Sequence, residues 1–472
     1  MADNIQPTTN ATTPASAPGD GQKPQRSAWS GKLAFILAGA ASAVGLGNLW
    51  RFPTLAAQYG GGTFIFTYFV LAFTFGISLL LLETALGRKT GLSVIGAFSS
   101  LNRKWKFVGV LAAAVPFIIT PYYCVIGGWV TKYLTAYITN MPSEVAADGF
   151  FTAFITSPVA SYVFMLIFML LCIAVVALGV KNGIEKANMI MMPLLLVMAV
   201  GISVFVLMQP GAAEGAAYYL IPDFSKFSPE LVINALGQMF YSLSLAMGIM
   251  VTYGSYLSKK ENLSESVACI AGFDLVVSFL AGLMIVPAAF VMLGLGEGGI
   301  MAAGPSLMFV TLPGVFEGMG GAATVVGLVF FILVLFAAMT SAISLIEACT
   351  SIVHDGTHWS RGKSLAVVGA FVIIVGCFVN SGYNALIFIE PLGPGTQILD
   401  FFDFISNSVM MPIVALLTCV FVGWIIKPKA IIDEVRVSSK FKLAGPWTIM
   451  IKYIAPVLVA IILVWNLVNQ FL

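Results

Sequence analysis

Residues 39 to 59 read Gly-Ala-Ala-Ser-Ala-Val-Gly-Leu-Gly-Asn-Leu-Trp-Arg-Phe-Pro-Thr-Leu-Ala-Ala-Gln-Tyr. Gly45, Gly47 and Asn48 interrupt an apolar segment of membrane-spanning length, and Arg51 and Pro53 follow. Every backbone amide in the hydrocarbon core needs a partner, so an interruption is stable only where it faces protein or an aqueous site. Discontinuous helices supply substrate and ion sites in secondary transporters. The segment therefore predicts a binding site at mid-membrane depth.

The composition is that of a polytopic membrane protein. Of the 472 residues, 59% are hydrophobic and 9% are charged, against about 25% charged residues in a soluble domain. A run of about 20 apolar residues is long enough to cross the hydrocarbon core as a helix. Such runs predict an all-α protein with eleven transmembrane helices, at 33–58, 63–87, 107–138, 159–179, 187–208, 231–257, 264–294, 322–353, 364–389, 398–426 and 446–471.

Lys and Arg residues predict the orientation, because cytoplasmic loops carry an excess of them. With a cytoplasmic N-terminus, 19 of the 23 Lys and Arg residues fall on the cytoplasmic side, and the C-terminus is external. The net charge of +2 therefore reflects topology, and we expect a lipid bilayer and no nucleic acid as partner. Residues 1–25 are rich in Ala, Thr and Pro and predict a disordered cytoplasmic tail before a transporter domain at 26–472.

A second interruption lies in the run 231–257, where Ser242, Ser244, Ala246 and Gly248 break an apolar helix. The first five and the next five runs then form two halves, 26–208 and 230–426, with a break in the first helix of each. Corresponding breaks in two halves indicate a transporter binding site. Each half contains an odd number of helices, so the second half begins on the opposite side of the membrane and the halves must be inverted repeats. The run 446–471 is then an extra eleventh helix.

Other chemistries find little support. All six cysteines lie in apolar runs at no metal-ligand spacing, as expected of buried thiols. The sequence contains no Gly-rich phosphate loop, so ATP-driven transport has no support. It also shows no convergent set of nucleophile, base and oxyanion donors. We expect no enzyme activity.

Several motifs together resemble one family. They lie at 44–53, 83–88, 122–123, 238–248, 279–282 and 337–341. Their order and spacing resemble the neurotransmitter:sodium symporters, which include bacterial amino acid transporters, and the eleven predicted helices resemble the bacterial members. The resemblance implies a LeuT-like fold with discontinuous first and sixth helices, the bacterial inner membrane, and a monomer or weak dimer.

The resemblance implies two Na⁺ sites made of oxygen ligands, which hard cations prefer. The first would use the Ala43 carbonyl, Asn48, Ser242 and Asp274, with the substrate carboxylate as a further ligand. The second would use the carbonyls of Ala41, Val44 and Ala337 and the hydroxyls of Thr340 and Ser341.

Asp274 departs from the chloride-dependent members, many of which have Asn there. The chain keeps Tyr68, Gln238, Ser242 and Ser278, the counterpart of the chloride site, but supplies its own carboxylate. An ionisable residue inside the membrane is costly and indicates function. We expect chloride independence, with Asp274 balancing the sodium charge.

The resemblance also implies the substrate. Monoamine transporters of the family carry an acidic residue at the place of Gly45, so glycine there implies a substrate with its own carboxylate. Apolar walls favour a neutral, hydrophobic α-amino acid, and Ala246, where many relatives have Gly, leaves its size open. The expected contacts are Ala43, Gly45, Leu46, Gly47, Ile119, Tyr123, Tyr241, Ser244, Met247, Ser341 and Leu345.

Alternating access needs a gate on each face. The resemblance implies an outer gate of Arg51 and Asp403 with Tyr123 and Tyr241 as its lid. The inner gate would comprise Arg26, Trp29, Ser255, Tyr256 and Asp355. Glu83 would hold free amides of the second broken helix, and the role of Glu347 stays open.

The leading hypothesis is a symporter that imports one amino acid with two Na⁺ ions. A proton-coupled amino acid transporter that uses Asp274 as its proton carrier is the nearest alternative. An amino acid sensor that does not transport, built on the same scaffold, is another.

Overall fold

The structure is a computed structural model that describes residues 28–293 and 304–471. Within these ranges every extended regular element is a helix, and the one β-bridge joins Gly61 and Pro222. Nine helical segments there are long and apolar enough to cross a membrane. They are α4–η1–α5 (Gly62–Thr90), α7 (Lys106–Ile138), α10 (Ala160–Ala177), η3–α11 (Val180–Leu207), α15 (Leu263–Leu293), α17 (Ala323–Thr357), α18 (Arg361–Ser381), α19–η7–α20–η8 (Ile398–Ile425) and α22–η9–α23 (Ala444–Phe471).

Two further segments are interrupted where the sequence predicts breaks. α1 (Lys32–Ala43) stops before Gly45, and the chain resumes as α2 (Leu46–Leu49) and α3 (Arg51–Gln58) after a bend of 59°. α13 (Pro229–Ser242) and α14 (Ile249–Ser255) are separated by residues 243–248. The described residues hold up to ten segments that are long and apolar enough to cross a membrane if the first broken pair counts as one. The expected count of eleven requires that α13 and α14 form one further membrane segment, and it stays a prediction.

Two predicted boundaries are wrong. The helix expected at 364–389 ends at Ser381, and the chain turns from Gly382 onward, where the Asn384 side chain accepts the amide of Ala385 at 2.6 Å. The helix expected to begin at 187 begins at Val180 instead, because the π-helical segment η3 (Val180–Glu185) precedes α11 (Lys186–Leu207). Apolar composition marks neither a local turn nor a π-helical segment.

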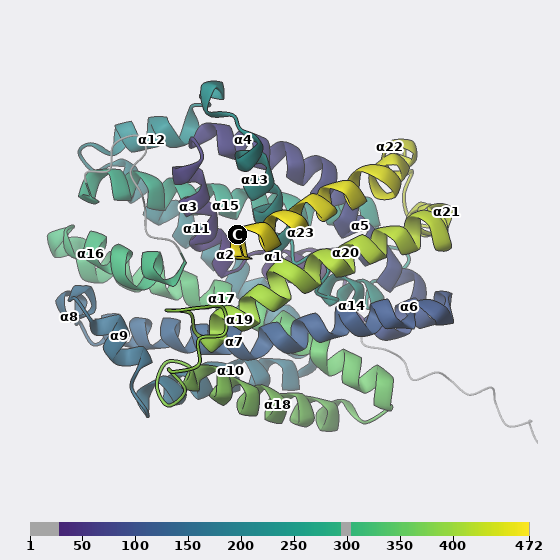
Figure 1. The fold of residues 1–472 in the computed structure, drawn as a ribbon, viewed down its shortest axis with the longest axis horizontal. Coiled ribbons are helices and arrows are strands. Elements are labelled where there is room, and N and C mark those ends of the chain that lie inside the picture. Colours follow the sequence, from purple (N-terminus) through teal and green to yellow (C-terminus); the bar gives the residue numbers. More distant parts are fainter. Residues whose placement is uncertain (1–27, 294–303, 472) are drawn as a thin grey trace, which may run out of the picture.

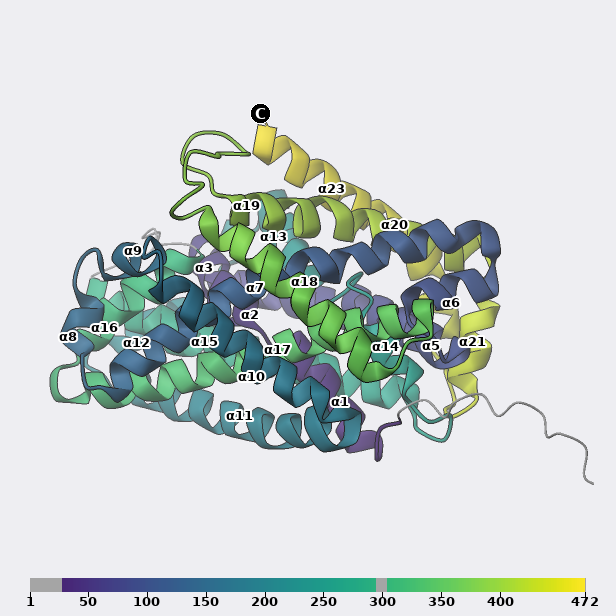
Figure 2. The same ribbon diagram turned by 90° about the horizontal axis from the view of Figure 1, so that it is seen from below.

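Loops predicted on the same side of the membrane lie at the same end of the bundle. The short helices α6 (Val94–Leu101) and α21 (Lys429–Arg436) lie at one end, and α8 (Pro142–Ala146), α9 (Phe150–Ile155) and α16 (Leu312–Glu317) lie at the other (Figures 1 and 2). The long helices α7 and α17 pack along each other through the middle. The two broken segments therefore lie in the interior of the bundle.

Contacts with neighbouring helices fix both halves of each broken segment. In the first segment, the Tyr59 hydroxyl donates to the Glu230 carboxylate at 2.7 Å, which ties the end of α3 to α13. Burial and this carboxylate raise the pKa of Tyr59 to about 12. In the second segment, a Cβ on Gly87 would lie 1.9 Å from the Val251 carbonyl oxygen. Glycine at position 87 thus lets α5 (Ile77–Thr90) lie directly against α14.

Candidate functional site

A small cavity of about 30 Å³ lies where the break after α1 meets the break after α13, between α7 and α17. All eleven residues predicted to contact the substrate line this cavity. Ser42 and Ile249 also line it and were missed. Ser42 lies between the predicted residues Ala41 and Ala43, and Ile249 lies two residues after Met247 at the start of α14. Closeness to a break is therefore the signal that could have found them.

Glycines in the first break let other groups approach the backbone. A Cβ on Gly45 would lie 2.8 Å from Ser341 Oγ and 3.2 Å from the Tyr123 hydroxyl, and one on Gly47 would lie 2.6 Å from the Tyr241 ring. The amide of Leu46 points at the Tyr123 hydroxyl at 3.4 Å. The start of α2 therefore presents backbone N–H groups to the cavity, and such groups attract a carboxylate.

A buried carboxylate lies beside this cavity. Asp274 on α15 is fully buried, and its Oδ1 accepts from the Ser242 hydroxyl at 2.6 Å and the Asn48 side-chain amide at 2.7 Å. Its Oδ2 accepts from the Tyr68 hydroxyl at 3.1 Å. Asn48, Ser242 and Asp274, three of the four groups predicted to form the first ion site, are therefore in mutual contact. The fourth, the Ala43 carbonyl, belongs to a residue that lines the cavity.

The counterpart of the chloride site also converges. Ser278 Oγ lies 2.8 Å from the Asn48 side-chain nitrogen, and the Gln238 amide donates to the Gly47 carbonyl at 3.2 Å. Gln238 and Ser278 are fully buried, as is Tyr68. The four predicted residues thus surround the Asp274 carboxylate and the start of α2. Whether an anion binds there stays a prediction.

The residues predicted for the second ion site lie at the other side of the first break. Ser341 Oγ donates to the Val44 carbonyl at 3.2 Å, and the Thr340 hydroxyl donates to the Ala337 carbonyl at 3.1 Å. Ala41 and Ala337 are buried. The Ser341 hydroxyl of α17 therefore lies at the carbonyl end of α1, where a helix terminus carries partial negative charge, and the Thr340 hydroxyl precedes it on α17.

Ser244 and Ala246 have backbone angles that side chains seldom adopt. Their φ values are +52° and +60°, and the Ser244 hydroxyl donates to the Ser42 carbonyl at 2.8 Å. The Ala246 amide donates to the Glu83 carboxylate at 2.7 Å, as predicted for helix-break support. The Ala246 residue lines a separate cavity of about 10 Å³ beside Glu83 and not the substrate cavity. Its methyl group therefore constrains the break rather than the space beside the substrate.

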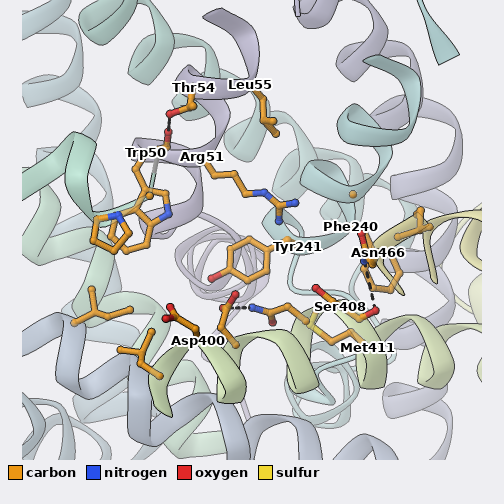
Figure 3. Close-up of a pocket in the computed structure, with 18 of the residues that line it drawn as sticks. Trp50, Arg51, Thr54, Leu55, Phe240, Tyr241, Asp400, Ser408, Met411 and Asn466 are labelled. Atoms are coloured by element: carbon orange, nitrogen blue, oxygen red, sulfur yellow. Dashed lines mark hydrogen bonds between the residues drawn. The ribbon is translucent and has the colours of Figure 1, made fainter. Parts of the chain in front are cut away.

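A wider cavity of about 380 Å³ opens above the substrate cavity, and both Arg51 and Asp403 line it. Figure 3 shows Arg51 reaching over the Tyr241 ring, with Asp400 on the opposite wall. Asp403 Oδ1 accepts from Asn407 at 2.6 Å and Tyr122 at 3.1 Å. In the described part of the chain no ion pair joins Arg51 to Asp403. Arg51 and Asp403, the predicted outer-gate pair, therefore line the same cavity without forming an ion pair in the described structure.

The opposite face is sealed by the segment before α1. Trp29 is buried, its indole N–H donates to the Tyr253 carbonyl at 3.1 Å, and its amide donates to the Tyr256 carbonyl at 3.3 Å. Asp355 accepts the amide of Ser93 at 2.7 Å. Ser255, also predicted for this gate, donates within its own helix to Thr252. Arg26 lies outside the described residues.

Glu347 belongs to this seal, although its role could not be predicted. It is fully buried, pairs with Arg361 at 2.5 Å and accepts from the Tyr256 hydroxyl at 2.7 Å. Ser351 contacts both Tyr256 and Glu347. The sequence separation of Glu347 and Arg361 gives no sign of their pairing, because a turn between α17 and α18 brings them together.

Comparisons with known proteins assign the chain to a family. A model of the sodium:neurotransmitter symporter family matches residues 26–154 and 155–471. An uncharacterized sodium-dependent transporter of Haemophilus influenzae is 32% identical over 466 residues, which cover 94% of this chain and 98% of that one. A sodium- and chloride-dependent taurine transporter of Rattus norvegicus is 25% identical over 91% of this chain and 76% of its own.

A solved structure is similar over nearly the whole chain. The crystal structure of MhsT in complex with L-phenylalanine has a TM-score of 0.83 and 35% sequence identity, and the match covers 93% of this chain and 99% of that one. This likeness confirms the expected LeuT-like fold. The chain belongs to the sodium:neurotransmitter symporter family and is a sodium-dependent transporter rather than an enzyme.

Proposed function

We propose that the chain is a symporter that imports a neutral, hydrophobic α-amino acid with two Na⁺ ions and without chloride. The observation that carries this proposal is the Asp274 carboxylate, held by Asn48, Ser242 and Tyr68 beside the cavity between the broken helices. A fixed negative charge there can balance a monovalent cation, which is the role that chloride would otherwise have.

The donor sets support two sodium ions. Ser242 and Asp274 offer hydroxyl and carboxylate oxygens on the α15 side of the first break. Asn48 would add its amide oxygen, which here accepts the Gly45 amide at 2.9 Å. Thr340 and Ser341 offer hydroxyls on the α17 side, next to main-chain carbonyls. Hydroxyl, carbonyl and carboxylate oxygens suit hard cations, and α1 packs against both α15, which carries Asp274, and α17, which carries Thr340 and Ser341.

The cavity lining supports an amino acid substrate. Amides at the start of α2 and the Tyr123 hydroxyl can hold a carboxylate, while the carbonyls of Ala43 and Tyr241 can accept from an ammonium group. The remaining wall is mostly apolar, with Ile119, Met247 and Leu345. MhsT, a structural relative, was solved with L-phenylalanine, which supports a hydrophobic side chain.

The two faces support alternating access. The outer cavity is open above Tyr241 and the inner face is closed by Trp29 and Tyr256, an arrangement suited to admitting substrate from outside. We propose that residues 26–208 and 230–426 are inverted repeats, with 446–471 as an additional helix. We also propose a bacterial inner membrane location with the N-terminus cytoplasmic and the C-terminus external.

Uptake by proteoliposomes tests this function. Radiolabelled amino acids are supplied under an inward Na⁺ gradient, under a pH gradient without Na⁺, and with gluconate replacing chloride. We expect uptake above the equilibrium level only with the Na⁺ gradient and equally well in gluconate. Accumulation driven by the pH gradient alone would favour proton coupling through Asp274, and binding without any accumulation would favour a sensor.

A further inference from the structure

Tyr253 on α14 contacts both the inner seal and the neighbourhood of the second ion site. Its carbonyl accepts the Trp29 indole N–H at 3.1 Å, and the two rings meet edge to face with centroids 5.2 Å apart. Its hydroxyl donates to Ser344 Oγ at 2.8 Å. Tyr253 and Ser344 are both fully buried, so water cannot replace either partner without a cavity opening.

Ser344 continues the contact toward the predicted ion ligands on α17. It lies one helical turn beyond Thr340, and its hydroxyl donates to the Thr340 carbonyl at 2.9 Å. Thr340 in turn donates to the Ala337 carbonyl at 3.1 Å. Since a serine hydroxyl has one proton, its donation to Thr340 leaves its oxygen to accept from Tyr253. These hydrogen bonds therefore all donate in one direction, from Tyr253 on α14 to the turn of α17 that carries the proposed sodium ligands.

These contacts join two events that alternating access must keep together. A cation held by the Thr340 hydroxyl and the Ala337 carbonyl would fix this turn of α17 and with it the orientation of Ser344. Ser344 then holds the Tyr253 hydroxyl, and Tyr253 holds Trp29 against α14. By linkage, a contact that favours the sealed state when the ion is bound must also favour ion binding when the seal is closed.

We propose that Tyr253 and Ser344 are positioning residues that couple occupancy of the second sodium site to closure of the inner seal by Trp29. The inference rests on the proposed function, because it requires Na⁺ at Thr340. It assigns a role to two hydroxyls that neither line the substrate cavity nor belong to the predicted ion ligands.

The test removes single hydroxyl groups. Tyr253→Phe keeps the ring that packs on Trp29 and the carbonyl that accepts its indole, and Ser344→Ala removes the acceptor. Tyr219→Phe is the matched control, because Tyr219 is equally buried and its hydroxyl donates to the Phe279 carbonyl at 2.9 Å in a region apart from the ion ligands. Two quantities are measured on purified full-length protein: the Na⁺ concentration for half-maximal thermal stabilisation, and hydrogen exchange of residues 28–38 with and without Na⁺.

In the unaltered protein, Na⁺ should slow exchange in residues 28–38. Each hydroxyl deletion should raise the half-maximal Na⁺ concentration about three- to tenfold, the range expected for one hydrogen bond, and the double variant should add little more. Slowing by Na⁺ should be lost in both variants even at saturating Na⁺, and Tyr219→Phe should change neither quantity.

Two outcomes oppose the inference and can be told apart. Unchanged Na⁺ dependence and unchanged slowing in both Tyr253→Phe and Ser344→Ala would overturn the coupling role while leaving sodium binding intact. If the unaltered protein shows no stabilisation by Na⁺ at all, the proposed function fails first and the coupling role fails with it.

Discussion

Replacing Asp274 by Asn tests the charge balance on which chloride independence depends. The substitution keeps the size of the side chain but removes the negative charge that accepts from Asn48 at 2.7 Å, Ser242 at 2.6 Å and Tyr68 at 3.1 Å. A unit negative charge about 4 Å from a monovalent cation attracts it by about 4 kcal/mol at an effective dielectric constant of about 20. Loss of that attraction corresponds to about a thousandfold weaker Na⁺ binding.

The assay is amino acid uptake under a Na⁺ gradient, in chloride and in gluconate, over a range of Na⁺ concentrations. Asp274→Asn should be nearly inactive in gluconate and recover in chloride, because an anion held near Tyr68 and Ser278 can replace the lost charge. Glu317→Gln is the matched control, since it also removes one carboxylate charge, and Glu317 accepts from the Ser143 hydroxyl at 2.7 Å and lines neither the substrate cavity nor the wider cavity. Full transport by Asp274→Asn without chloride would refute the reasoning.

Three further substitutions have defined outcomes. Gly45→Ala should abolish thermal stabilisation by amino acids with little change in the ligand-free melting temperature, because its Cβ would lie 2.8 Å from Ser341 Oγ in a cavity of about 30 Å³; retained stabilisation would count against the site. Ala246→Gly should raise the melting temperature by about 1–2 °C, since a left-handed φ of +60° costs a non-glycine residue about 1–2 kcal/mol; a lower melting temperature would contradict this account of the break. Arg361→Gln leaves the buried Glu347 charge uncompensated, which costs about 3–5 kcal/mol. It should speed hydrogen exchange in residues 249–256, and unchanged exchange would show that the ion pair does not support the seal.

The sequence predicts those parts of the site that follow from local chemistry. Gly45, Gly47 and Asn48 are unfavourable inside an apolar membrane helix unless the backbone breaks at a site, so the first break and its neighbours could be located. Gln238 with Ser242, and Asp274 with Ser278, lie four residues apart and share helix faces, which is why their convergence on Gly47 and Asn48 agrees with expectation. The family resemblance then supplies partners from distant helices.

Features that depend on tertiary contacts could not be predicted. The pairing of Glu347 with Arg361 arises from a turn between two helices, and the hydroxyl chain from Tyr253 through Ser344 joins residues 91 positions apart. Ala246 lines the cavity beside Glu83 rather than the substrate cavity, and composition does not reveal its left-handed backbone. The end of α18 at Ser381 likewise depends on local hydrogen bonds rather than on hydropathy.

A density map of the protein in NaCl with a bound hydrophobic amino acid would show the substrate and both ions at once. We expect the amino acid in the cavity between the two breaks, with its carboxylate at the amides of Leu46 and Gly47. Two ion peaks should flank α1, one at Asn48 and Asp274 and one at Thr340 and Ser341. Continuous helix through residues 43–47 and 243–248, or a ligand bound elsewhere with neither ion peak present, would contradict the account.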